Sequence, residues 1–107
     1  MPKDFFMDIN DISFQITDNG CRLCAMCHGK QIGSIFFVKI GADKLMISEA
    51  TIESEYNGEN VELYLIQQII KIAREQHRKI ISICPQISNI FNQHPEFDDI
   101  RLLNQGR

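Results

Sequence analysis

The sequence Ile80-Ile81-Ser82-Ile83-Cys84-Pro85, residues 80–85, is an apolar run that ends at a proline. Proline has no N–H to donate to a β-ladder, and it disfavours the helical conformation in the residue before it. The run therefore predicts a short buried strand over residues 80–83, with the Cys84 thiol at the point where the strand stops. A thiol in that position is a candidate for chemistry.

A long amphipathic helix is predicted just before this strand. Apolar residues recur at helical spacing from Leu65 to Ala73, and polar residues such as Gln68 and Arg74 occupy the opposite side. The pattern predicts a helix over residues 61–77. Acidic residues near its start and basic residues near its end suit the helix dipole.

Four further strands are predicted before the helix. A clean alternation of apolar and polar residues begins at Ile12 and stops at the turn Asp18-Asn19-Gly20. Three more apolar runs follow, separated by short turns that contain glycine, so the simplest arrangement is an antiparallel meander. The four predicted strands cover residues 12–17, 21–27, 31–39 and 45–50.

A strand, a helix and a strand in this order pack as a right-handed crossover, so the strands around Ile47 and Ile81 are predicted to be parallel neighbours. The predicted fold is α+β, with a mixed, mostly antiparallel five-stranded sheet, a β-α-β crossover, one long helix and a short C-terminal helix. Parallel strands end at the same edge of a sheet. Residues 49–52, the loop before the helix and Cys84 are therefore predicted to converge there.

The composition is that of one globular domain spanning residues 1–107, with 44% apolar and 23% charged residues. Residues 1–10 are predicted to be a lead-in and residues 101–107 a tail. The net charge of -3, without any basic cluster, argues against a nucleic-acid partner. No apolar run approaches the roughly 18 residues that span a bilayer, and no secretion signal is recognisable, so a cytoplasmic protein without membrane contact is predicted.

Four cysteines in a cytoplasmic chain are predicted to be reduced thiols. Two more specific roles are suggested by the spacing of Cys21, Cys24, Cys27 and His28. These roles are a metal cluster and a c-type haem attachment. In a strand, however, Cys21 and Cys27 share one face while Cys24 points to the other. Haem attachment further requires export. We therefore predict no metal site and no haem.

The predicted arrangement resembles the GNAT acetyltransferase superfamily. Within it, Cys84-Pro85 followed by the segment from His94-Pro95-Glu96-Phe97 to Ile100 looks like the ending of a small, single-domain acetyltransferase-like family, the YjdJ type. The segment from His28 to Gly33 is similar to the superfamily's turn between its second and third strands. The resemblance spans about residues 23–100.

The resemblance implies acetyl-CoA as cofactor, bound at the splayed ends of the two parallel strands, and an unknown amine as acceptor. The pyrophosphate would lie on backbone amides at the N-terminus of the long helix, where unpaired N–H groups and the dipole favour anions. The cofactor-binding residues implied are Ile52, Asn57, Gly58, Glu59, Asn60, Val61 and Glu62.

This loop departs from the family's pattern, which is roughly Arg-Gly-Lys-Gly-Ile-Ala. The matching segment Asn57-Gly58-Glu59-Asn60-Val61-Glu62 lacks the basic residue and has Asn60 at the second glycine. Four glutamates, at positions 53, 55, 59 and 62, would face a polyanionic cofactor. The alternative needs no ligand, because an asparagine could cap the helix while the glutamates complement its dipole.

Two residues are candidate catalytic groups. In the family the Cys-Pro thiol is a candidate for a catalytic or acyl-carrying role, which the resemblance carries over to Cys84, and a buried structural thiol is the alternative. Glu49 stands where relatives have histidine and could act as a general base if burial raised its pKa, whereas plain solvation at a strand end is the alternative. His94 could activate the thiol, but we favour a role in holding the C-terminal turn.

Two functions remain open at this point. The first is a small acetyl-CoA-dependent N-acetyltransferase in which Cys84 or Glu49 assists acetyl transfer to an amine. The second is a non-catalytic binding or interaction module that kept the scaffold and lost efficient binding of coenzyme A. The acidic loop favours the second function, and the C-terminal motif favours the first.

Overall fold

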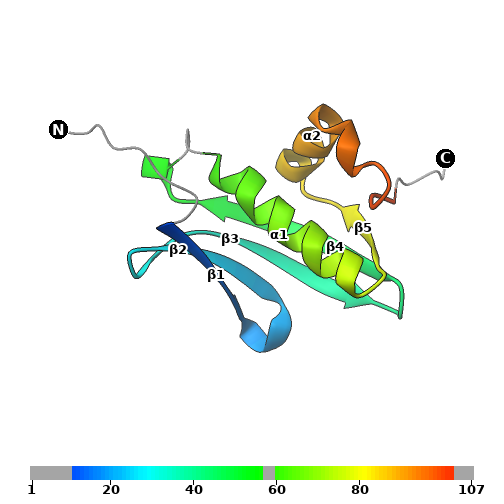
Figure 1. Cartoon of the computed structure of the whole chain (residues 1–107), viewed down its shortest axis with the longest axis horizontal. Coiled ribbons are helices and arrows are strands. Elements are labelled where there is room, and N and C mark those ends of the chain that lie inside the picture. Colours follow the sequence, from blue (N-terminus) through cyan, green and yellow to red (C-terminus); the bar gives the residue numbers. More distant parts are fainter. Residues whose placement is uncertain (1–10, 57–59, 103–107) are drawn as a thin grey trace.

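A five-stranded sheet and two helices make up the computed structural model, which describes residues 11–56 and 60–102 (Figure 1). The strands are β1 (Ile12–Thr17), β2 (Arg22–Cys27), β3 (Lys30–Ile40), β4 (Lys44–Ile52) and β5 (Lys79–Ser82), and the helices are α1 (Val61–Glu75) and α2 (Pro85–Gln93). Three short 3-10 helices accompany them, η2 (Asp18–Gly20), η3 (Ser54–Tyr56) and η4 (Pro95–Phe97).

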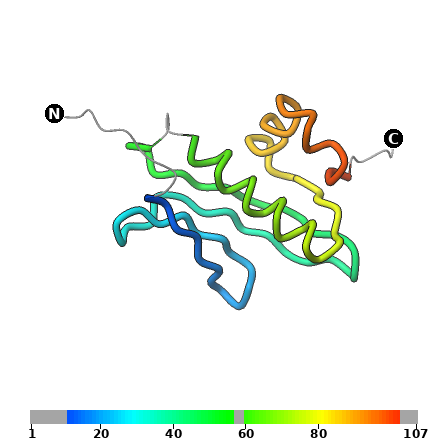
Figure 2. Tube along the Cα trace, viewed as in Figure 1, coloured from blue at the N-terminus to red at the C-terminus, as the bar shows by residue number. Residues whose placement is uncertain are grey.

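The predicted sheet topology is confirmed. Strands β1 to β4 form an antiparallel meander, and β5 pairs parallel to β4 with Lys44 opposite Lys79 and Ile47 opposite Ser82. The chain runs from β4 through α1 into β5, as the trace in Figure 2 shows. The β-α-β crossover therefore brings the C-terminal ends of β4 and β5 to the same edge of the sheet, beside the start of α2.

The core lies between one face of the sheet and the apolar stripe of α1, which crosses that face in Figure 1. Burying a large aliphatic side chain contributes about 1.5–3 kcal/mol, so this layer supplies most of the apolar stabilisation. The helix contributes Leu65, Ile66, Ile69, Ile70 and Ala73, and the sheet contributes Leu23, Ala25, Ile35, Phe37, Leu45 and Ile47, all 5% exposed or less.

Helix α1 ends two residues earlier than predicted, at Glu75. His77 has a φ of 57°, which no α-helix can continue. Its N–H bonds the Arg74 carbonyl at 3.2 Å, and the Arg78 N–H bonds the Ala73 carbonyl at 2.8 Å. This pair of bonds is the Schellman arrangement, which satisfies the last carbonyls of the helix.

An irregularity in the pairing of β3 with β4 reverses which side chains of β4 face the core. Phe37 is opposite Ile47 but Phe36 is opposite Glu49, so Ser48 is an extra residue that bulges from β4. Before the bulge, Ile47 faces α1; after it, Ala50 and Ile52 pack against the core. Glu49 consequently points to the other face of the sheet, where it is exposed.

Gly33 allows close packing between β3, β4 and α1. A β-carbon at this position would lie 2.8 Å from Cδ1 of Ile52 and 3.2 Å from Cδ1 of Leu65. We expect Gly33→Ala to lower the free energy of unfolding by about 1–3 kcal/mol, since a methyl group would overpack this contact. Urea unfolding followed by circular dichroism measures the change. An unchanged unfolding midpoint would mean that the side chains of Ile52 and Leu65 move aside at no cost and that the packing around Gly33 is not tight.

Candidate functional site

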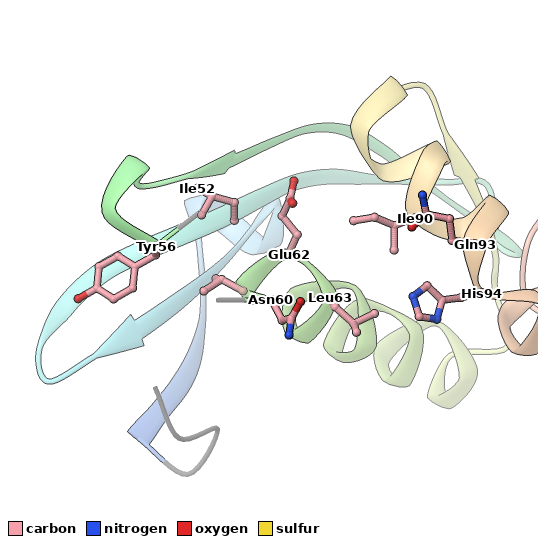
Figure 3. Close-up of a pocket in the computed structure, with 9 residues that line it drawn as sticks. Ile52, Tyr56, Asn60, Glu62, Leu63, Ile90, Gln93 and His94 are labelled. Atoms are coloured by element: carbon pink, nitrogen blue, oxygen red, sulfur yellow. The ribbon is translucent and has the colours of Figure 1, made fainter. Parts of the chain in front are cut away.

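A cavity of about 250 Å³ lies at the start of α1 (Figure 3). Its walls come from the end of β4, from η3, from the first turn of α1 and from the C-terminal end of α2. The first three segments follow one another within residues 52–63, and the fold brings residues 90–94 of the α2 region beside them. The lining residues are Ile52, Tyr56, Asn60, Val61, Glu62, Leu63, Ile90, Gln93 and His94.

The first turn of α1 forms part of the cavity wall. Asn60 is the N-cap residue, yet its side chain makes no capping hydrogen bond. Its backbone is left-handed, with φ 61° and ψ 23°, a conformation that glycine adopts freely and asparagine tolerates better than most residues. The first N–H groups of a helix lack carbonyl partners within the helix, so this end of α1 favours an anion.

Glu62 opposes that preference, because it lines the cavity with a carboxylate. Partial burial raises the pKa of Glu62 above its ordinary value by desolvating the charged form. Its Oε2 accepts a hydrogen bond from Nε2 of Gln86 on α2, which ties the first turn of α1 to α2. Glu62 is the only carboxylate among the described residues that line the cavity.

The acidic segment before α1 meets a base from β3 that sequence reasoning missed. Lys30 donates a hydrogen bond to Oε1 of Glu55 at 2.5 Å, and its ammonium lies 5.8 Å from the Tyr56 ring centroid. The hydrogen bond from Lys30 to Glu55 raises the pKa of the lysine. One of the four predicted acids is therefore already paired and does not act on the cavity as an isolated charge.

His94 enters the cavity wall from the end of α2. Its Nδ1 lies 3.0 Å from Oε2 of Glu96, and its ring stacks on Phe97 with centroids 5.6 Å apart. Hydrogen bonds from its own backbone and from His94 lower the pKa of Glu96. The turn-holding role that we favoured for His94 is thus accompanied by a position facing the candidate site.

Cys84 lies at the end of β5, where the sequence predicted the strand to stop. It is the N-cap residue of α2, with Pro85 as the first helical residue. Its carbonyl accepts hydrogen bonds from the Ser88 N–H at 2.9 Å and from the Ser82 hydroxyl at 3.1 Å. The side chain is 8% exposed, belongs to the hydrophobic core and does not line the cavity.

Comparison with known proteins identifies the family to which this arrangement belongs. A family model described as GCN5-related N-acetyl-transferase matches residues 16–100, which is most of the chain. The chain belongs to the GCN5-related N-acetyltransferase (GNAT) family. The narrower YjdJ-type subfamily stays a prediction. No curated protein matches the chain.

Solved structures share the fold at low sequence identity. A proposed GCN5-like N-acetyltransferase from Staphylococcus aureus, 16% identical, aligns over 91% of this chain and 95% of its own with a TM-score of 0.71. A proposed acetyltransferase from Deinococcus radiodurans, 13% identical, aligns over 94% and 88% with a TM-score of 0.60. The protein AAC(6')-Iy, solved with a bisubstrate analogue of coenzyme A, is 13% identical and aligns over 80% of this chain and 67% of its own with a TM-score of 0.52.

The predicted site residues of this GNAT family member fall into three groups. Ile52, Asn60, Val61 and Glu62 line the cavity together. Cys84 and Glu49 do not line it; Cys84 is in the core, and Glu49 is exposed on the face of the sheet away from α1. The predicted residues Asn57, Gly58 and Glu59 lie outside the described residues.

The cysteines near the second strand of this GNAT domain do not converge. Cys27 is in the core, and burial raises the pKa of its thiol. Cys24 is buried outside the core cluster, on the other face of β2, with its sulfur 3.8 Å from the Thr17 hydroxyl. Among the described residues, no three histidine, cysteine or acidic side chains come together as metal ligands.

Over residues 11–56 and 60–102 of this GNAT family member, neither helix is long and apolar enough to cross a bilayer.

Proposed function

We propose that this GNAT family member is a cytoplasmic N-acetyltransferase that uses acetyl-CoA to acetylate an amine. The observation that carries the proposal is the cavity at the start of α1, whose wall includes Ile52 at the end of β4, in a chain whose family is established. AAC(6')-Iy, a protein of the same fold solved with a bisubstrate analogue of coenzyme A, supports the choice of cofactor.

The phosphates of the cofactor would lie on the first turn of α1. Backbone N–H groups there do not depend on side-chain identity, so an anion site of this kind can survive the loss of the family's basic residue. The left-handed backbone of Asn60 keeps the conformation that glycine would provide. Ile52, Val61 and Glu62 would form the walls, and residues 57–59 would complete the loop.

The acetyl group would be transferred near the ends of β4 and β5. The Cys84 thiol attacks the thioester carbonyl carbon of acetyl-CoA, the carbon–sulfur bond breaks, and coenzyme A leaves with the proton of the thiol. The amine nitrogen then attacks the carbonyl carbon of the acetylated Cys84, and the cysteine sulfur leaves. Cys84 is thus proposed to carry the acetyl group between the cofactor and the amine. Glu49 is proposed to take the proton of the amine through water, which requires the amine to approach from the outer face of the sheet, where Glu49 is exposed. The only feature that this chemistry requires of the acceptor is a free amine.

Titration of the protein with acetyl-CoA by calorimetry, followed by an assay of free thiol with a panel of small amines, tests the proposal. We expect saturable binding and amine-dependent release of coenzyme A. Absence of binding at millimolar acetyl-CoA would remove the enzyme proposal.

The second candidate, a non-catalytic binding module, is favoured by one observation, the Glu62 carboxylate in the cavity wall. This function predicts the opposite result, because a non-catalytic module would show neither acetyl-CoA binding nor release of coenzyme A thiol in the same experiments.

Glu62→Gln is expected to tighten acetyl-CoA binding by about fivefold to tenfold at neutral pH. At ~6 Å and an effective dielectric constant of ~20, a carboxylate and a phosphate repel by ~3 kcal/mol, and solvent screening of this partly exposed group reduces that to ~1 kcal/mol. Because the pKa of Glu62 is raised, the wild-type protein should gain affinity as pH falls through that raised value, and the variant should not.

The matched control for this prediction is Glu75→Gln, which removes the same charge from an exposed position at the other end of α1. It should leave the dissociation constant unchanged. The raised pKa also means that the charged Glu62 opposes folding at neutral pH, so Glu62→Gln should melt slightly higher there, with the difference vanishing in acid. Equal affinities for both variants would contradict the repulsion.

A further inference from the structure

The cavity wall formed by α1 carries an acidic side chain, Glu62, whereas the wall at the end of α2 carries a histidine, His94. Figure 3 shows Glu62 and Leu63 on the first turn of α1, and Gln93 and His94 at the end of α2 on the other side. Tyr56, Glu62 and His94 are the titratable side chains among the lining residues, and His94 alone of these can become positive. The loop before α1 has no basic residue at positions 57–62.

The contact with Glu96 fixes how the imidazole of His94 is presented. The pKa of Glu96 is lowered, so this carboxylate is ionised at neutral pH and can only accept a hydrogen bond. Nδ1 of His94 must therefore carry the proton that it shares with Oε2 of Glu96 across 3.0 Å. In the neutral ring Nε2 is then an acceptor, whereas in the protonated ring it becomes a donor.

Titratable side chains from three elements lie on the cavity wall or on the turn that carries His94. Glu96 lies on its own turn, and Glu62 and Tyr56 line the cavity from α1 and η3; no other charged group lines the cavity or is bonded to the ring within the described residues. Phe97 stacks on the ring and holds its orientation, and the side chain is 31% exposed. A fixed ring loses little freedom on binding.

We propose that His94 binds a phosphate group of the cofactor and takes up a proton as it does so, supplying from α2 the cation that the loop lacks. The inference rests on the proposed function, since it concerns the same cavity. The proton comes from solvent and adds to Nε2, which then donates a charge-assisted hydrogen bond to a phosphate oxygen. Binding of the cofactor is therefore coupled to pH through this ring.

Calorimetric titration of the full-length protein with acetyl-CoA tests the coupling. Measurements at pH 6 and pH 8, each in two buffers with different ionisation enthalpies, give the affinity and the number of protons taken up. Acetyl-pantetheine, which has the same thioester but no diphosphate or nucleotide, is the cofactor control. Thermal melting of each variant confirms that it is folded.

Wild-type protein is expected to take up a proton with acetyl-CoA and to bind more weakly at pH 8. His94→Gln should weaken acetyl-CoA binding at pH 6 by about tenfold, the usual value of a hydrogen bond to a charged group, and reduce the proton uptake. His94→Lys should restore the affinity without proton uptake. His77→Asn at the other end of α1 should behave as wild type, and acetyl-pantetheine should not distinguish any of the proteins.

The outcomes separate the two proposals. No binding of acetyl-CoA to the wild type would remove the proposed function, and this inference with it. Wild-type binding that His94→Gln leaves unchanged would overturn the inference and leave the proposed function standing. A His94→Gln variant with unchanged affinity but slower turnover would also overturn it, because the ring would then act on the amine as a base and not on the phosphate.

Discussion

Replacing Cys84 by alanine is expected to reduce acetyl transfer by at least about 100-fold while leaving the fold intact. In the proposed step, the Cys84 thiolate attacks the thioester carbon, coenzyme A leaves as a thiolate and takes up the thiol's proton, and the amine then displaces the cysteine. A group that acts directly in proton or acyl transfer commonly contributes that factor. The free energy of unfolding should change by no more than about 1.5 kcal/mol, since only the sulfur atom is lost.

The matched control is Cys27→Ala, which removes a buried core thiol of 4% exposure on β2. It should have a similar effect on stability and no effect on turnover. Mass spectrometry after mixing with acetyl-CoA, without an amine, should find one added acetyl group on the wild type and none on Cys84→Ala. Turnover that persists in Cys84→Ala would remove the thiol from the reaction and leave direct attack by the amine.

The buried position of Cys84 makes this experiment informative. A thiol of 8% exposure in the core is well placed as a structural residue, and the same position terminates β5 and begins α2. Cofactor entry between β4 and β5 would have to expose the sulfur. If the residue is only structural, alanine substitution changes stability and not rate, so the two measurements together distinguish the alternatives.

The elements of the fold could be predicted because their signals are local. The alternation after Ile12, the helical period of α1 and the stop at Pro85 each depend on a few neighbouring residues. The parallel pairing of β4 with β5 then follows from the handedness of crossovers. The predicted end of α1 was wrong for a local reason as well. The helix ends where His77 adopts a left-handed backbone conformation, and histidine has no strong preference for that conformation.

Contacts between distant segments could not be predicted. The pairing of Lys30 with Glu55 and that of Gln86 with Glu62 join residues 25 and 24 positions apart, so no sequence window contains both partners. The bulge at Ser48 is visible in the sequence pattern, because the apolar residues change from odd-numbered positions, Leu45 and Ile47, to even-numbered ones, Ala50 and Ile52. That shift in alternation would have placed Glu49 on the outer face.

The candidate site was predicted where backbone geometry defines it and missed where α2 contributes. Asn60, Val61 and Glu62 follow from the position of a helix start, which the period of α1 fixes. His94 and Gln93 depend on how α2 packs, which the sequence expresses only as two buried positions, Ile87 and Phe91. The cavity therefore depends on a small number of contacts that hold α2 in place.

Phe91→Ala is expected to have the largest effect on stability, a loss of about 3–5 kcal/mol in the free energy of unfolding. Phe91 is 1% exposed, its ring meets that of Phe97 edge to face at 6.0 Å, and the Arg101 guanidinium lies 5.4 Å from its centroid. In a domain of this size the loss corresponds to a melting temperature lower by about 12 °C or more. Chemical and thermal denaturation measure both quantities.

Removal of Phe91 should also weaken cofactor binding, because the residue anchors the helix that carries Ile90, Gln93 and His94 into the cavity wall. Phe36→Ala is the control: its half-buried ring lies on the outer face of β3 under Arg22, 4.3 Å from the guanidinium, and its loss should cost no more than about 1.5 kcal/mol. A Phe91→Ala protein that loses stability yet binds acetyl-CoA with wild-type affinity at low temperature would place the cofactor away from α2. The start of α1 would then be the whole of the binding site.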